Sequence, residues 1–292
     1  MKFGIMFANS ANYATSEGAT ALAVAADECG IESIWAVEHV VIPHGYQSQY
    51  PYHESGKIPG GEQDPDITDP LLWLAHAAAL TKEVRLATGI LIVPQRNPVI
   101  LAKECATLAK LSNNRFDLGI GVGWLEEEFA ALNVPWPKRG KRTDEYCEAM
   151  AALWSQDRAQ YHGEYINFEN AISRPQPDGG TIPIVVGGHT DAAAKRAGRY
   201  GTGFFPAKGT NDELVHLFNV VKRTAEENGR DGDAIENTTM VWSPRRDSLD
   251  RAKELAELGV DRLVVAPPTS NPAKIRDAVE ELAELVAPLA TR

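Results

Sequence analysis

Short apolar runs alternate along the chain with longer segments in which apolar positions recur at helical spacing. The runs are rich in β-branched residues, and the helical segments that follow often close at a glycine. This alternation is typical of parallel βαβ units, in which a helix returns the chain to the starting edge of the sheet. We interpret eight runs as strands: 2–7, 33–39, 84–92, 115–121, 182–186, 202–205, 238–242 and 261–266.

Helices are expected in the intervals between these strands. The pattern predicts them at 15–29, 70–81, 98–111, 142–154, 191–200, 212–228, 248–258 and 272–289. The joins around Gly30 and Gly259 repeat the same order of helix, glycine and strand near the two ends of the chain. Without a linker-like change in composition, this count favours a single α/β domain, a (β/α)8 TIM barrel over residues 1–292, rather than an open doubly wound sheet.

Two connections are too long to be simple turns, and long connections tend to carry function. Residues 40–69 contain several tyrosines and histidines and the pair Gly60–Gly61. Residues 155–180 contain HGEYINFEN, which predicts a small β-hairpin.

The composition limits which kinds of partner the protein is expected to bind and in which compartment it is expected to lie. With 29 basic and 40 acidic residues the chain has a net charge of −11, which disfavours non-specific binding to nucleic acid or anionic membranes. Three cysteines without CxxC spacing argue against a disulfide framework or a zinc site, so no metal is expected. The opening MKFGIMF lacks the pattern of a signal peptide, and no apolar run is long enough to span a membrane, so we expect a cytoplasmic protein.

The strand ends supply the candidate chemistry, because a barrel builds its active site at the carboxyl ends of its strands. The second strand ends in Glu38 and His39. His39 is the candidate for proton transfer, since imidazole titrates near neutral pH. Glu38 is expected to point to the opposite side of the strand, so the pair is no simple dyad. A core histidine held by one hydrogen bond is the alternative.

Glycines mark two further strand ends. Gly187 and Gly188 precede a helix start, which predicts a phosphate-sized anion site; an ordinary N-capped turn, with Asp191 competing for the helix start, is the alternative. The segment GIGVGW, residues 119–124, lets a ligand approach the backbone but is not the dinucleotide fingerprint. Motifs for an activated serine, a nucleoside triphosphate or a catalytic metal are missing from the sequence.

Several spaced motifs make nearly the whole chain resemble the luciferase-like monooxygenase superfamily, and within it the group that depends on the deazaflavin coenzyme F420. They are EHVVIP (38–43), ATGILIVPQRNPVILAKECATL (87–108), NNRFDLGIGVGWLEEEF (113–129), RGKRTDEY (139–146) and PIVVGGHTDAAAKRAGRYGTGFFP (183–206). The resemblance implies a barrel with a flavin or deazaflavin across its strand ends.

The resemblance also implies roles for individual residues. His39 matches the acid/base beside the ring, and the bond between Gly89 and Ile90 matches a non-prolyl cis peptide behind it. Cofactor contacts are implied for Glu38, Gly89, Ile90, Gly123, Trp124, Glu128, Gly187 and Gly188. Apart from the resemblance, Tyr46, Tyr50, Tyr52 and Trp73 are candidate aromatic walls for a substrate, with simple packing of loop aromatics as the alternative.

The sugar-phosphate dehydrogenases of this group carry a second catalytic glutamate after strand four, where this chain offers Glu126 as a candidate. They also have a long region between strands seven and eight that is missing here, which argues against a sugar phosphate. We therefore expect hydride transfer between coenzyme F420 and another small organic substrate, in a homodimer. The alternatives are an FMN-dependent two-component monooxygenase, supplied with reduced flavin by a separate reductase, and a catalytically silent barrel that binds flavin or acts structurally.

Overall fold

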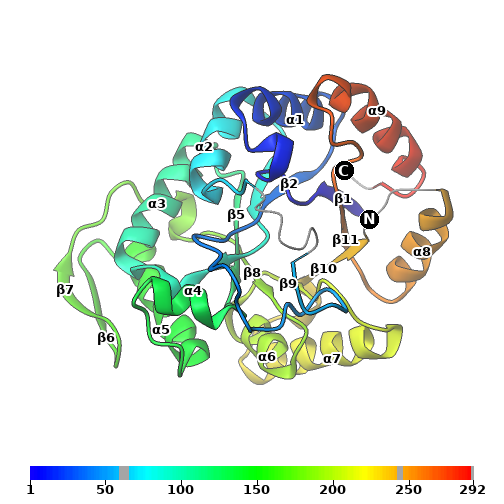
Figure 1. Cartoon of the computed structure of the whole chain (residues 1–292). Coiled ribbons are helices and arrows are strands. Elements are labelled where there is room, and N and C mark those ends of the chain that lie inside the picture. Colours follow the sequence, from blue (N-terminus) through cyan, green and yellow to red (C-terminus); the bar gives the residue numbers. More distant parts are fainter. Residues whose placement is uncertain (59–65, 242–245, 291–292) are drawn as a thin grey trace.

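The computed structural model describes residues 1–58, 66–241 and 246–290, so Gly60, Gly61 and Trp242 lie outside the described residues. Eight parallel strands form a closed barrel, because the last strand pairs with the first and β3 pairs with β5 (Figure 1). In barrel order they are β1 (Lys2–Ile5), β2 (Ser33–Ala36), β3 (Arg85–Thr88), β5 (Phe116–Gly121), β8 (Ile184–Gly187), β9 (Gly203–Phe205), β10 (Glu236–Val241) and β11 (Arg262–Val265). The predicted (β/α)8 barrel is confirmed.

Helices cover the outside of this barrel. They are α1 (Ser16–Glu28), α2 (Pro70–Leu80), α3 (Pro98–Leu111), α5 (Arg139–Ser155), α6 (Asp191–Tyr200), α7 (Asn211–Glu227), α8 (Arg246–Glu257) and α9 (Ile275–Val286). Their starts follow ordinary capping chemistry: Asp69 and Asn97 each cap a helix whose first residue is proline, and Thr210 forms a capping box with Glu213. Among the described residues, none of the helices combines the length and apolar composition needed to cross a membrane.

Three of the differences from the sequence prediction affect the region of the candidate site. Strand β2 stops at Ala36, before Glu38 and His39. The third strand is divided into β3 and the two-residue β4 (Leu91–Ile92), with a cis peptide bond between Gly89 and Ile90. A short helix that was not predicted, α4 (Glu126–Ala131), follows β5.

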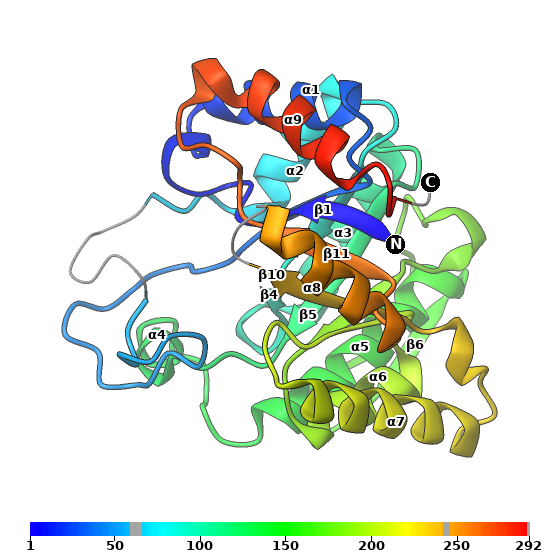
Figure 2. The ribbon, with the colours of Figure 1, turned by 90° about the vertical axis from the view of Figure 1, so that its right-hand side faces the viewer.

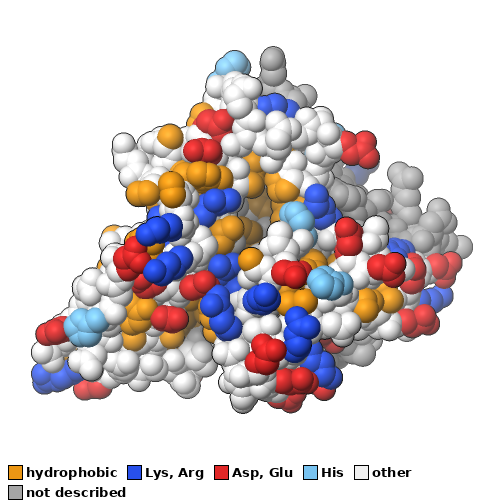
Figure 3. All heavy atoms as spheres, turned by 90° about the horizontal axis from the view of Figure 1, so that it is seen from below, with side chains coloured by type: hydrophobic (Ala, Val, Ile, Leu, Met, Phe, Trp, Pro, Cys, Tyr) orange, Lys and Arg blue, Asp and Glu red, His pale blue; other side chains and the backbone are white. Residues whose placement is uncertain are grey.

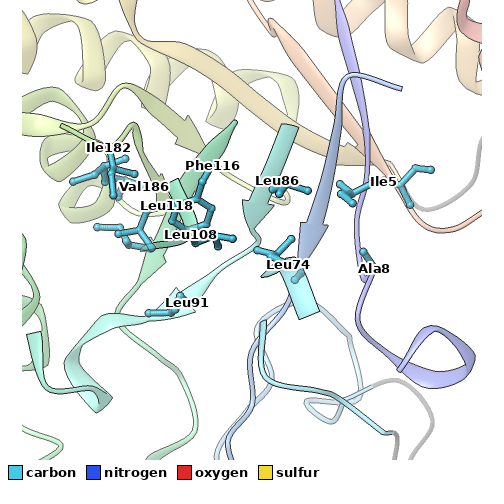
Figure 4. Close-up of a cluster of buried hydrophobic side chains, with 14 of the residues drawn as sticks. Ile5, Ala8, Leu74, Leu86, Leu91, Leu108, Phe116, Leu118, Ile182 and Val186 are labelled. Atoms are coloured by element: carbon cyan, nitrogen blue, oxygen red, sulfur yellow. The ribbon is translucent and has the colours of Figure 1, made fainter. Parts of the chain in front are cut away.

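Alternation along the strands separates two apolar cores. Residues that face the barrel axis form a small inner core: Met6, Trp35, Ala87, Val185, Phe205 and Val264. Their strand neighbours pack outward against the helices in a much larger core, where Leu86 and Phe116 lie near Leu74 of α2 and Leu108 of α3 (Figure 4).

The predicted hairpin is present as β6 (Ala159–His162) and β7 (Asn167–Ala171), and it projects from the barrel (Figure 1). The buried carboxylate of Glu145 on α5 holds its turn by accepting hydrogen bonds from the backbone N–H groups of Glu164, Tyr165 and Ile166 at 2.5 to 3.0 Å.

Candidate active site

The imidazole of His39 lies just beyond the carboxyl end of β2 and is paired with a buried carboxylate. Its Nδ1 atom is 3.1 Å from Oε2 of Glu128, and the two side chains are 12% and 0% exposed. The Nε2 atom of His39 has no hydrogen-bond partner within the described part of the chain. The resemblance implies a cofactor contact for Glu128, but it does not reveal this pair, because the two residues are 89 positions apart.

The protonation of this pair follows from its surroundings. Burial raises the pKa of Glu128, but the hydrogen bond and charge of His39 and the N–H of Val40 outweigh it, so the net pKa is lowered. The carboxylate is therefore ionised at neutral pH and can only accept hydrogen bonds. Nδ1 of His39 must then carry the proton, which leaves the lone pair on Nε2 when the ring is neutral.

Glu38 and His39 have different partners and form no dyad, as predicted, although both lie beyond the end of β2. Oε2 of Glu38 accepts a hydrogen bond from the backbone N–H of Ile92 at 2.5 Å, and its Oε1 accepts one from Nε of Arg96 at 2.8 Å. The side chain is 1% exposed, and burial raises its pKa against the opposing effect of Arg96. This geometry gives Glu38 a structural role beside β4, and a direct cofactor contact remains only a prediction.

The segment after β3 confirms the expected cis peptide between Gly89 and Ile90 and shows what the nearby glycines do. A Cβ atom on Gly121 would lie 2.1 Å from Cδ1 of Ile90, and one on Gly187 would lie 2.6 Å from its Cγ2. Both distances are far below van der Waals contact. The glycines at the ends of β5 and β8 therefore make room for the side chain of Ile90 inside the mouth.

Residues 40–58 and α4 lie together beyond the carboxyl ends of the strands (Figure 2). Trp124 joins them to His39: its ring centroid is 5.6 Å from that of His39, 5.6 Å from Tyr46 and 5.1 Å from Tyr50, all edge-on. These contacts place the predicted aromatic residues Tyr46 and Tyr50 beside the candidate proton-transfer group. Tyr52 continues the row, 5.5 Å from Tyr50.

Glu127 holds the same loop by its backbone. Its carboxylate accepts hydrogen bonds from the backbone N–H of Gln47 at 2.6 Å and from the Ser48 hydroxyl at 2.7 Å. Its neighbour Glu126 is exposed, and within the described residues its carboxylate makes no hydrogen bond. Of the three consecutive glutamates, Glu128 is the one that contacts His39, so the structure gives the catalytic candidate Glu126 no contact with that residue.

The structure does not place Trp73 at this mouth. Trp73 lies on α2, is 5% exposed, and belongs to the large outer core. Its indole N–H donates to the carbonyl of Tyr13 at 2.9 Å. The candidate wall residue Trp73 is therefore part of the packing between α2 and the barrel and does not join Tyr46 and Tyr50.

The end of β8 has the features of an anion site. Gly188 adopts φ = +130°, a conformation that favours glycine, and α6 begins two residues after His189. Nδ1 of His189 is buried without a hydrogen-bond partner among the described residues, and Lys208 approaches the ring of Tyr52, which itself contacts His189. Oδ1 of Asp191 lies 2.9 Å from Nε2 of His216, so this carboxylate has a partner on α7. Thr190 caps the start of α6 by accepting a hydrogen bond from the backbone N–H of Ala193 at 3.3 Å, as in the N-capped alternative. The orphaned imidazole nitrogen of His189 and the nearby cation of Lys208 are the features that suit a phosphate-bearing group.

Gly123 lies two residues after the end of β5 and directly before Trp124. It has φ = +80°, and a Cβ atom there would lie 2.7 Å from the ring of Phe129. Its carbonyl accepts a hydrogen bond from Nε of Arg139 at 3.3 Å. The glycine therefore permits the turn that brings Trp124 over His39.

Away from the mouth, a hollow of about 730 Å³ lies outside the barrel between α5, α6 and α7. Basic side chains gather on the face of the molecule that carries it (Figure 3), and its lining includes Lys195, Arg199 and Arg223. Asp144 pairs with both Arg196 and Arg199, which compensates much of this charge. The described residues contain no group of His, Cys, Asp and Glu that could hold a metal ion.

Comparison with known proteins assigns the chain to a family. The sequence profile described as luciferase-like monooxygenase matches residues 1–264. The chain belongs to this luciferase-like monooxygenase family. An uncharacterized protein of Mycobacterium tuberculosis, Rv0953c, is 32% identical over 290 residues, covering 98% of this chain and 99% of the relative. An F420-dependent glucose-6-phosphate dehydrogenase of Mycobacterium avium is 30% identical, covering 89% of this chain and 83% of the relative.

Solved structures of other proteins share the fold. An F420-dependent secondary alcohol dehydrogenase, solved with an F420–acetone adduct, aligns with a TM-score of 0.80 at 17% identity, covering 99% of both chains. The monooxygenase RslO1 from Streptomyces bottropensis aligns with a TM-score of 0.76 at 22% identity and the same coverage. At these identities the structures show a shared fold, and the matching family model together with the F420-dependent relative supports an enzymatic role for the chain.

Proposed function

We propose that this protein is an oxidoreductase that transfers a hydride between coenzyme F420 and a small organic substrate, with His39 as the acid/base. The observation that carries the proposal is the state of His39, a partly exposed imidazole at the barrel mouth. Its Nδ1 is bound to an ionised glutamate, and its Nε2 has no hydrogen-bond partner among the residues that the structure describes. The F420-dependent relatives support this choice of coenzyme.

The mouth offers residues for each part of such a coenzyme. Gly188, His189 and Lys208 would hold its phosphate, and Ile90 and Trp124 would lie towards its ring. When bound, the deazaflavin supplies hydride chemistry and reacts poorly with oxygen. Tyr46 and Tyr50, packed on Trp124, would exclude water from the reacting atoms.

Nε2 of His39 handles the accompanying proton. In the oxidative direction it accepts the proton that the substrate loses together with the hydride, and in the reductive direction it returns that proton. The buried carboxylate of Glu128 stabilises the imidazolium formed in between.

A monooxygenase that uses reduced FMN is the second candidate, because the fold is shared with the monooxygenase RslO1. Binding and absorbance titrations of the purified protein with FMN and with coenzyme F420, run side by side, separate the two. Saturable binding of F420 supports hydride transfer. Tight FMN binding with oxygen consumption would replace the proposal by the monooxygenase, and binding of neither would indicate a catalytically silent barrel.

The substitution His39→Ala tests the proton-transfer role directly. We expect F420 affinity to stay within about twofold, since no coenzyme-holding group is removed, and turnover to fall by about 10²- to 10⁴-fold, the usual value of a positioned acid/base. Turnover is measured with a substrate found by screening alcohols and carbonyl compounds. His162→Ala, on the exposed hairpin strand β6, is the matched control. Unchanged turnover in His39→Ala would remove His39 from the chemistry.

A further inference from the structure

Both oxygens of the buried Glu128 carboxylate are occupied, and by different kinds of partner. Oε2 faces Nδ1 of His39 at 3.1 Å. Oε1 accepts the backbone N–H of Val40 at 2.6 Å and that of Val41 at 3.2 Å. One side chain on α4 therefore fixes the imidazole and the first two residues of the loop that follows it.

The two oxygens make different demands on their partners. The backbone N–H groups of Val40 and Val41 can only donate, so Oε1 must be an acceptor. The imidazole can either donate or accept a hydrogen bond at Nδ1. Its tautomer therefore depends on whether the side-chain atom of residue 128 that faces Nδ1 is an acceptor or a donor. An ionised carboxylate presents a second acceptor, which selects the tautomer with the proton on Nδ1.

We infer that Glu128 is a positioning residue for the proton-transfer step: it holds His39 in the Nδ1–H tautomer, so that the basic nitrogen, Nε2, is the one left free for the substrate. This role rests on the proposed function only in assuming that His39 is the acid/base. Glu128 itself reaches the substrate through His39 and does not touch it.

The substitution Glu128→Gln gives this inference a distinctive signature. The Gln carbonyl oxygen can keep both backbone N–H donors, but its NH₂ group then faces Nδ1 of His39. An NH₂ group can only donate, so Nδ1 must lose its proton and Nε2 must gain it. The size of the side chain hardly changes, yet the tautomer is inverted. In the serine protease triad, the equivalent exchange of carboxylate for amide lowers kcat about 10⁴-fold through the wrong tautomer.

Nitrogen-15 NMR of the histidine rings measures the tautomer directly, in the protein without coenzyme or substrate. His39→Ala assigns the signals. We expect the wild-type protein and Glu128→Asp, which keeps an acceptor-only group, to show the proton on Nδ1, and Glu128→Gln to show it on Nε2. The matched control Glu126→Gln changes the same residue type on the same helix without contact to His39, and should keep the wild-type signals.

A purely structural Glu128 would give a different result. If Glu128→Gln leaves the His39 proton on Nδ1, or if Glu128→Asp shifts the tautomer as strongly as Gln does, the inference is overturned. Should the Gln variant fold poorly, Glu128→Asp and Glu128→Ala still distinguish the cases, because the ring should show the wild-type tautomer in Asp and a mixture in Ala.

Kinetics then separate this inference from the proposed function. With F420, Glu128→Gln should lower kcat by about 10²- to 10⁴-fold while KM for the coenzyme stays nearly constant. If His39→Ala retains full turnover, the proposed function fails whatever the NMR shows. If His39 is essential but Glu128→Gln inverts the tautomer without loss of kcat, the acid/base role stands and the positioning role falls.

Discussion

At the scale of single residues, the barrel mouth depends on a match between Ile90 and the glycines opposite it. A methyl group on Gly121 would meet Cδ1 of Ile90 at 2.1 Å. Overpacking of this kind typically costs about 1–3 kcal/mol. We expect Gly121→Ala to lower the free energy of unfolding by that amount, as measured by urea denaturation.

The double variant Gly121→Ala/Ile90→Ala is the control for this prediction, because it removes the side chain that the new methyl group meets. The double variant should recover part of the stability lost in Gly121→Ala, relative to Ile90→Ala alone. Additive losses in the double-mutant cycle would show that Gly121 is required for a reason other than contact with Ile90.

At the scale of elements, α4 and the loop of residues 40–58 form one unit joined by two neighbouring glutamates. Glu128 holds Val40 and Val41, and Glu127 holds Gln47 and Ser48. Hydrogen bonds led by that from the Ser48 hydroxyl lower the pKa of Glu127 from 4.5 to about 2. The contribution of Glu127 to the closed loop is therefore complete above about pH 4.5 and is lost as the pH falls towards 2.

The substitution Glu127→Gln should loosen this loop at neutral pH, because a neutral amide accepts the hydrogen bonds of Gln47 and Ser48 more weakly than a carboxylate does. We expect amide hydrogen exchange in residues 44–52 to become several-fold faster, measured by mass spectrometry, while the barrel strands keep their protection. Glu126→Gln should leave the loop unchanged. Equal exchange in wild-type protein and Glu127→Gln would show that the aromatic contacts of Trp124 alone hold the loop.

The elements differ in how well the sequence predicts them. The bounds of α3 and α6 match the prediction, because local chemistry at Asn97–Pro98 and Thr190 starts the helices. Strand β2 was predicted too long, since periodicity does not show where pairing with a neighbour stops. Helix α4 is too short for its period to stand out.

The candidate site was only partly predictable for a related reason. The position of His39 at a strand end follows from the βαβ pattern. Its pairing with Glu128 depends on how a loop and a helix meet in space, across 89 residues of sequence. The direction of the Trp73 side chain likewise depends on how α2 packs against the barrel, and this packing cannot be deduced from the sequence.

At the scale of the whole molecule, the barrel is closed where β11 meets β1, and a buried arginine lies at the amino end of this seam. Nη2 of Arg262 is 2.7 Å from Oε1 of Glu32 and 3.0 Å from Oε2 of Glu236, and the Arg262 side chain is 3% exposed. It thus connects β11 to β10 and to the residue that precedes β2. Nothing in the alternation of strands and helices predicts this contact.

Replacing Arg262 with methionine should destabilise the whole barrel, because it removes the ion-pair partner of Glu32 and leaves Glu236 paired with Lys2 alone. Removal of one member of a buried ion pair typically costs about 3–5 kcal/mol. Urea denaturation of wild-type protein and Arg262→Met at pH 7 measures the difference. Arg276→Met is the matched control, since its pair with Glu28 is 62% and 47% exposed and should contribute less than about 1 kcal/mol.

The pH dependence of this difference identifies its cause. Burial raises the pKa of Glu32, but the hydrogen bond and charge of Arg262 outweigh it and lower the pKa below 4.5. The stabilisation is therefore present above the unfolded pKa and is lost as the pH falls through the lowered value. The gap between wild-type protein and Arg262→Met should narrow on acidification. A gap that stays constant with pH would mean that Arg262 stabilises the seam by packing against Trp35, 5.6 Å away, rather than by its charge.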